Sequence, residues 1–354
     1  MNLDDLDHMR ALDARGMLDA IDNLPQQLSN GWMLGMQTDL PFGGDAVRQV
    51  VIAGMGGSAI GADLLAGYAA PLCSVPLVVH RNYDLPAWAS GDHTLVILSS
   101  KSGNTEETLS ALRVAQQRGC RVLAVTTGGA LAEQARALEI PSFPFRFEGQ
   151  PRAAVGYSFS ILLAILARLG LIPDPLSELD ETTALLRQLQ PGLSAGTPVF
   201  RNPAKRMAGQ LMGRWVVVFA SDALEPVARR WKGQINELAK AWAQFEFLPE
   251  ADHNTLAGLM NPDSLQSHMM ALFLRSESTH LRNLLRLDLT REACMVSGMT
   301  TDFYDAPGSS RMAQMWSALQ FGDYMAYYLA IAYGADPTEV DILEQFKQAL
   351  EADS

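Results

Sequence analysis

The sequence predicts an α/β protein with two related domains, each built on a doubly wound parallel sheet. Two observations predict this class. Between residues 50 and 140, short β-branched runs at 50–53, 94–98 and 121–126 alternate with stretches of helical periodicity, and strands separated by helical segments of this length form parallel sheets. After residue 190 the alternation begins again with an apolar run at 214–220. The second half therefore resembles a distant copy of the first.

Length and composition fit this organisation. A chain of 354 residues suggests two domains. We expect the first domain over residues 1–190, with a leading helix and a crossover helix, and the second over residues 191–354, with terminal helices. The net charge of −12 argues against a nucleic acid or an anionic membrane as partner. It does not argue against an anionic metabolite, because a helix N-terminus binds anions locally.

The cysteines and the N-terminus predict a cytoplasmic location. Cys73, Cys120 and Cys294 are far apart and outside any Cys-x-x-Cys pattern, so we interpret them as reduced thiols and not as a disulfide framework or a zinc site. The acidic N-terminus is unlike a signal peptide. No apolar run reaches the roughly 18 residues that a membrane span requires.

In chain order, the first half is predicted to begin with a helix that packs outside the first sheet, because apolar residues recur at helical spacing within residues 1–30. The elements predicted next are strands at 50–53, 75–79, 94–98 and 121–126, helices after residues 58 and 106, and helices at 131–138 and 153–169. Proline-rich stretches at 172–175 and 190–192 predict a crossing between the domains.

The second half is predicted to open with a strand at 214–220, a turn at Ser221-Asp222 and a helix from Leu224, with Asp222 as its N-cap. Apolar runs at 269–274 and 293–296 are predicted as strands. Helices at 312–333 and about 341–350 close the chain.

Two glycine- and serine-rich turns follow the predicted strands at 50–53 and 94–98. Each leads into a helix, and a strand that turns directly into a helix leaves backbone N–H groups unpaired at the positive end of the helix dipole. This geometry binds phosphate. The residues expected to hold a phosphate are Gly56, Gly57, Ser58, Ser100, Ser102 and Thr105.

Two other interpretations of these turns stay open. Gly54-x-Gly56-x-x-Ala59 roughly fits the dinucleotide fingerprint, but the next strand ends in His80-Arg81 and not in the acidic residue that would hold a ribose. A cofactor with a 2′-phosphate would use Arg81 instead. The turns would also serve as simple reversals without a ligand, although their three hydroxyl side chains exceed what a turn needs.

Candidate acid–base groups lie in the second half. Glu237 is about 120° away from the apolar stripe of its predicted helix and is flanked by Arg230 and Gln234, which leaves a solvated surface residue as the alternative. His253 lies in a loop, where most histidines are simply exposed. No cluster with metal-ligand spacing and no Gly-x-Ser-x-Gly nucleophile elbow is present, so no metal and no cofactor are predicted.

Several motifs carry a resemblance to a known family. The segments Gly54–Ser58 and Ser100–Thr108 resemble the two phosphate loops of sugar isomerase (SIS) domains. The remainder, from about Val50 to the end, resembles the bifunctional phosphoglucose/phosphomannose isomerases. The matching motifs are Pro151-Arg152-Ala153-Ala154, Arg230–Glu237, Pro249–Asn254, and Gly334–Thr338 with Lys347.

The resemblance implies two SIS-type domains and the interconversion of glucose 6-phosphate, with mannose 6-phosphate as a further substrate, and fructose 6-phosphate through a cis-enediol. In that family Glu237 would transfer the proton between C1 and C2. His253 and Lys347 would open the sugar ring, and Arg152 would stabilise the enediolate. The resemblance also implies a homodimer in which His253 reaches the partner's site, and a place in glycolysis and gluconeogenesis.

One position departs from the family pattern, and two other functions stay possible. Lys101 stands where the family usually has tyrosine, which leaves the contacts of that loop open. A SIS-domain sugar-phosphate sensor would keep Ser58 and the second loop but would not need Glu237. Another SIS enzyme, such as an etherase or an amidotransferase-fed isomerase, is the other alternative, although residue 2 is Asn2 and not the glutaminase cysteine.

Overall fold

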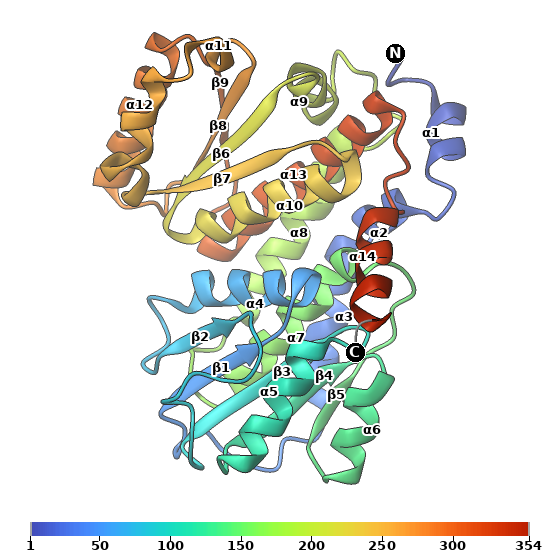
Figure 1. The fold of residues 1–354 in the computed structure, drawn as a ribbon, viewed down its shortest axis with the longest axis vertical. Helices are drawn as coiled ribbons and strands as arrows, with labels where there is room; N and C mark the ends of the chain where they lie inside the picture. Colours follow the sequence, from blue (N-terminus) through green and yellow to red (C-terminus); the bar gives the residue numbers. More distant parts are fainter. Residues whose placement is uncertain (1, 353–354) are drawn as a thin grey trace.

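The computed structural model describes residues 2–352 and contains two parallel β-sheets with helices on their faces (Figure 1). The first sheet has the strand order β2-β1-β3-β4-β5 and the second has the order β7-β6-β8-β9. Every strand pair in both sheets is parallel. Together with the comparisons reported below, these sheets confirm the predicted fold class.

The central strands of the first sheet are buried on both faces. Its strand β3 is buried along its whole length, because it lies between β1 and β4 and helices cover both sides. The strands are β1 (Gln49–Ala53), β2 (Leu77–His80), β3 (Thr94–Ser100), β4 (Arg121–Thr126) and β5 (Ser142–Pro144). The helices that follow its strands are α4 (Gly56–Ala69), α5 (Glu106–Gln117) and α6 (Gly129–Ala137).

The second sheet repeats this arrangement without a fifth strand. Its strands are β6 (Trp215–Ser221), β7 (Ala243–Leu248), β8 (Met269–Arg275) and β9 (Thr300–Asp305). The helices between them are η2 (Asp222–Leu224), α10 (Glu225–Ala239), η3 (Glu250–His253), η4 (Thr255–Met260), α11 (Asp263–Gln266) and α12 (Leu281–Val296).

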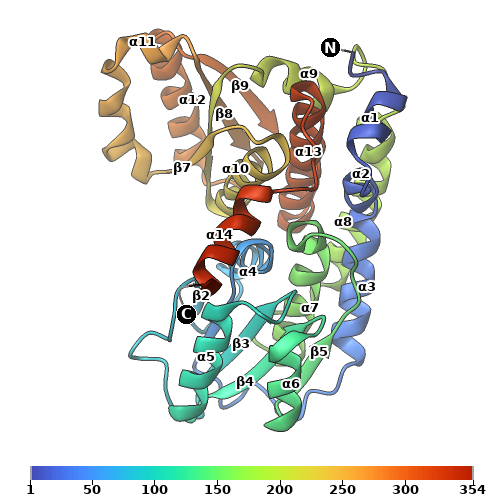
Figure 2. The same cartoon turned by 45° about the vertical axis from the view of Figure 1, so that its right-hand side comes forward.

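Apolar helices join the two sheets. Helix α13 is buried from Met312 to Ala332, because it packs against helices of both halves of the chain. Figure 2 shows α1, α2 and α3 along one side of the molecule beside α8 and α13. The remaining elements are α1 (Leu6–Leu12), α2 (Met17–Asp22), α3 (Leu24–Gln37), η1 (Pro151–Ala154), α7 (Val155–Arg168), α8 (Leu176–Leu193), α9 (Pro203–Leu211), α13 (Arg311–Tyr333) and α14 (Asp341–Ala352).

Four local predictions differ from the structure. The run at 293–296 is the last turn of α12 and not a strand. Residues 190–192 lie inside α8, which includes Pro191. The N-terminal helical pattern forms three helices, because Gly16 adopts a left-handed φ of 71° between α1 and α2. Asp222 does not cap α10, whose N-cap is Leu224. The carboxylate of Asp222 instead accepts a hydrogen bond from the backbone N–H of His280 at 3.1 Å.

No helix within residues 2–352 has the length and the apolar character needed to cross a membrane.

Candidate active site

The backbone of the first predicted phosphate loop packs tightly against neighbouring backbone. Gly56 adopts φ 48°, a left-handed conformation that favours glycine. A Cβ placed on Gly57 would lie 2.5 Å from the backbone of Pro151 and Arg152. Helix α4 has no side-chain cap at its N-terminus, so the N–H groups of its first turn are not satisfied by a capping side chain.

The second predicted loop meets the first. The backbone N–H of Lys101 donates to Ser58 Oγ at 3.1 Å, so Ser58 bridges the two loops. Within the second loop, Ser100 Oγ and Thr105 Oγ1 lie 2.9 Å apart, and the N–H of Asn104 donates to Ser102 Oγ at 3.3 Å. Helix α5 also lacks a side-chain cap bond. The structure therefore brings together all six residues that were predicted to hold a phosphate.

Arg152 and Glu237 form an ion pair between the two halves of the chain. Arg152 Nη1 lies 3.2 Å from Glu237 Oε2, although 85 positions separate the two residues in the sequence. The Arg152 side chain is 4% exposed and the Glu237 side chain 32% exposed, so the carboxylate is the more accessible of the two. Burial lowers the pKa of the Arg152 guanidinium from its usual value.

Backbone carbonyls fix the orientation of Arg152. Its Nη2 donates to the carbonyls of Pro337, at 3.1 Å, and Thr338. The Nε of Arg152 is buried and has no hydrogen-bond partner among residues 2–352. Because Gly57 touches the backbone of the same arginine, the first loop and the Arg152–Glu237 pair are adjacent.

Part of the polar side of α10 faces protein and not solvent. Arg230 and Gln234, which flank Glu237 on that side, are 4% and 2% exposed. Arg230 forms a two-pronged ion pair with Asp323 at 3.0 and 2.8 Å and donates to the carbonyl of Arg152 at 2.9 Å. The interpretation of Glu237 as a fully solvated surface residue therefore does not fit the fold.

His253 lies at the other end of the second sheet from Glu237. Glu237 is near the end of α10, just before β7 begins, whereas His253 follows the end of β7. A strand of this length spans about 17 Å, so the two side chains of one chain are far apart. The His253 side chain is exposed and has no hydrogen-bond partner among the described residues.

Lys347 lies on the exposed helix α14. Both views show α14 running away from the second sheet, toward the level of the first (Figures 1 and 2). No hydrogen bond or ion pair joins the Lys347 side chain to another described residue. The structure thus assembles the loops with Arg152 and Glu237 but brings neither His253 nor Lys347 into contact with them.

Sequence reasoning missed one cation at this site. Lys240 follows α10 with a left-handed φ of 52°, and its Nζ donates to the carbonyl of Asp336. Partial burial, and after it the charge of Arg152, lowers the pKa of this lysine. No local signal distinguished it from an ordinary lysine at a helix end.

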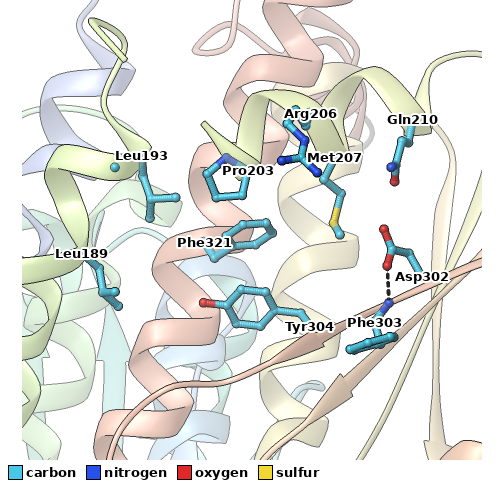
Figure 3. Close-up of a pocket in the computed structure, with 11 residues that line it drawn as sticks. Leu189, Leu193, Pro203, Arg206, Met207, Gln210, Asp302, Phe303, Tyr304 and Phe321 are labelled. Atoms are coloured by element: carbon cyan, nitrogen blue, oxygen red, sulfur yellow. Dashed lines mark hydrogen bonds between the residues drawn. The ribbon is translucent and has the colours of Figure 1, made fainter. Parts of the chain in front are cut away.

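A cavity of about 340 Å³ in the C-terminal half is separate from these residues (Figure 3). Tyr304 and Phe321 form its aromatic floor, with ring centroids 4.3 Å apart. None of the predicted site residues lines it. The lining residues are Leu189, Gly192, Leu193, Pro203, Arg206, Met207, Gln210, Asp302, Phe303, Tyr304 and Phe321.

No group of three or more His, Cys, Asp or Glu side chains within the described part of the chain is placed to hold a metal ion. The absence of a metal and of a cofactor stays a prediction.

Comparisons with known proteins agree with this arrangement. Residues 200–350 match the bacterial phospho-glucose isomerase C-terminal SIS domain. A bifunctional phosphoglucose/phosphomannose isomerase of Caldicellulosiruptor bescii is 38% identical over 94% of this chain and 98% of its own length. One from Aquifex aeolicus is 32% identical over 86% and 90%. A solved hypothetical protein of Thermus thermophilus shares the fold, with a TM-score of 0.73 and 18% identity over 98% of this chain and 94% of that one.

The parallel sheets, the paired glycine–serine loops and these matches define a SIS-domain protein of the phosphosugar isomerase class. Within that class the similarity extends over nearly the whole of both sequences. The chain belongs to the bifunctional phosphoglucose/phosphomannose isomerase family.

Proposed function

We propose that this protein interconverts glucose 6-phosphate and fructose 6-phosphate, and mannose 6-phosphate and fructose 6-phosphate, as an aldose–ketose isomerase. The observation that carries the proposal is the contact between Glu237 and Arg152 next to two uncapped helix N-termini. It sets a proton-transfer group and a cation beside a loop suited to bind an anion, since Gly57 packs against the backbone of Arg152.

The phosphate binds between the two loops. The N–H groups of the first turns of α4 and α5 and the hydroxyls of Ser58, Ser100, Ser102 and Thr105 hold it, and this remote binding energy aligns the reacting carbons. The N-terminal domain, residues 1–190, supplies this part of the site. The C-terminal domain, residues 191–354, supplies the acid–base groups.

The proton transfer uses Glu237. Its carboxylate removes the proton from C2 of the open-chain aldose, which gives a cis-enediol intermediate, and returns the proton to C1. The developing oxyanion lies near the positive charge of the Arg152 guanidinium, which the carbonyls of Pro337 and Thr338 hold in one orientation. No metal is required in this scheme.

Ring opening uses His253 and Lys347. Because β7 separates His253 from Glu237 within one chain, the histidine serves the site of a second subunit in a homodimer. An exposed loop after a strand is suited to reach across a two-fold interface. Lys347 approaches on α14. In a cytoplasmic setting this reaction belongs to glycolysis and gluconeogenesis.

The test is a coupled assay on fructose 6-phosphate that measures glucose 6-phosphate and mannose 6-phosphate together. Glu237→Gln keeps the shape of the side chain but cannot accept a proton, so we expect turnover to fall by about 10²–10⁴-fold with KM little changed. Wild-type protein that binds fructose 6-phosphate without forming either product would instead be a sugar-phosphate sensor.

A further inference from the structure

Residues 335–340, here called the strap, connect the buried helix α13 to the exposed helix α14. Three successive carbonyls of the strap accept hydrogen bonds from cations of the site. Lys240 Nζ donates to Asp336, and Arg152 Nη2 donates to Pro337 and Thr338. The strap is therefore held at one edge by the lysine and at the other by the arginine that contacts Glu237.

The strap folds so that these carbonyls point toward the cations. The carboxylate of Asp336 accepts from the backbone N–H groups of Thr338, at 2.7 Å, and Glu339, at 3.4 Å. Pro337 and Thr338 are buried. The strap is also tied to the N-terminal helices by the ion pair of Glu339 with Arg15, so Lys240 is the anchor nearest to the carbonyls that hold Arg152.

The backbone of Lys240 is unusual for its residue type. It ends α10 with φ 52°, a conformation in which glycine is the favoured residue at the end of a helix. A lysine there is strained, and strained residues gather at functional sites. Partial burial and the charge of Arg152 lower the pKa of the ammonium, whereas the carboxylates of Asp336, Asp341 and Glu237 raise it. The left-handed backbone is therefore the feature that disfavours a lysine at this position.

We propose that Lys240 is a positioning residue for the isomerase reaction, which anchors the strap and thereby fixes both Arg152 and the start of the helix that carries Lys347. The inference rests on the proposed function, because Arg152 and Lys347 have their roles only there. Lys240 itself touches neither Glu237 nor the phosphate loops through a hydrogen bond in the described structure.

The experiment compares Lys240→Gly with Glu139→Gly. Glu139 is exposed, lies after α6 and has nearly the same left-handed φ, 54°, so both substitutions remove the same backbone strain. Glu139→Gly is expected to unfold at the same temperature as the wild type or higher. Lys240→Gly is expected to unfold close to the wild-type temperature, because relief of the strain offsets the lost hydrogen bonds to Leu238 and Asp336. Only Lys240→Gly is expected to lose kcat, by about tenfold to a hundredfold, because a small displacement of a catalytic group costs up to about 10²-fold.

Two further measurements separate positioning from stability. Lys240→Arg keeps a donor at this place and is expected to recover most of the lost kcat, whereas KM should change little in any of the variants. Amide hydrogen exchange of residues 336–340 should be faster in Lys240→Gly and unchanged in Glu139→Gly.

A Lys240→Gly variant with wild-type kcat and unchanged exchange in the strap would overturn the inference while leaving the isomerase intact. Failure of the proposed function would look different, because the wild type itself would then form no product. The exchange experiment would still report whether Lys240 anchors the strap.

Discussion

Replacement of Gly57 by alanine tests whether the first phosphate loop and Arg152 form one packed unit. The added Cβ would lie 2.5 Å from three backbone atoms, the C and O of Pro151 and the N of Arg152. These distances are roughly 1 Å shorter than ordinary van der Waals contact. Backbone atoms on both sides cannot rotate away, so either α4 or the Pro151–Arg152 segment must shift.

The expected cost follows from this overlap. Overpacking of a filled site typically destabilises a protein by about 1–3 kcal/mol, whereas an alanine in place of a helical glycine gains about 0.5–1 kcal/mol. We expect a net loss of stability together with a fall in kcat, since Arg152 moves with its backbone. Gly209→Ala in α9 is the matched control, because a Cβ there meets nothing within 4 Å.

Urea denaturation and the coupled isomerase assay measure the two effects. Gly209→Ala should be at least as stable as the wild type and fully active. If Gly57→Ala were also as stable and as active as the wild type, the packing of the loop against Arg152 would not be tight, and the reasoning would fail.

Three further predictions address the phosphate, the subunits and pH. Ser100→Ala with Thr105→Ala should raise KM for fructose 6-phosphate more than either change alone, since a hydrogen bond to a charged group contributes about 1.5–3 kcal/mol; an unchanged KM would exclude this loop as the phosphate site. Glu237→Gln and His253→Ala proteins, each inactive alone, should regain up to about a quarter of wild-type activity after joint unfolding and refolding, because half of randomly paired dimers then carry one intact site; a mixture without activity would place both residues in one subunit's site. Burial raises the pKa of Asp22, so ionisation of this carboxyl costs stability that is present at low pH and is lost as pH rises through the folded-state pKa. The free energy of unfolding of Asp22→Asn, taken relative to the wild type, should therefore be more favourable at pH 7 than at pH 4. The same difference at both pH values would contradict this.

The sequence predicted the strands that are fully buried and missed most of those that are not. The runs at 50–53 and 94–98 are apolar because both faces of β1 and β3 are covered. Strands β7 and β9 lie at the edges of the second sheet and mix polar with apolar residues, so neither was predicted. The run at 293–296 is too short to distinguish a strand from the end of a helix.

Prediction of the site from the sequence has a similar limit. Motifs and spacing identified the loops, because a strand that turns into a helix has local consequences for its N–H groups. The contact between Arg152 and Glu237 depends on how two sheets pack, and no local pattern encodes that. Lys240 was missed because its role depends on the carbonyl of a residue 96 positions away.

Hydrogen bonds between the two halves of the chain determine what would happen if the polypeptide were cut into two fragments. Arg152 belongs to the first half, and its acceptors Glu237, Pro337 and Thr338 belong to the second. Fragments cut between the sheets would each be inactive, and each would expose polar groups that the other satisfies. Recovery of activity from two such fragments would therefore require that they reassociate and re-form these bonds.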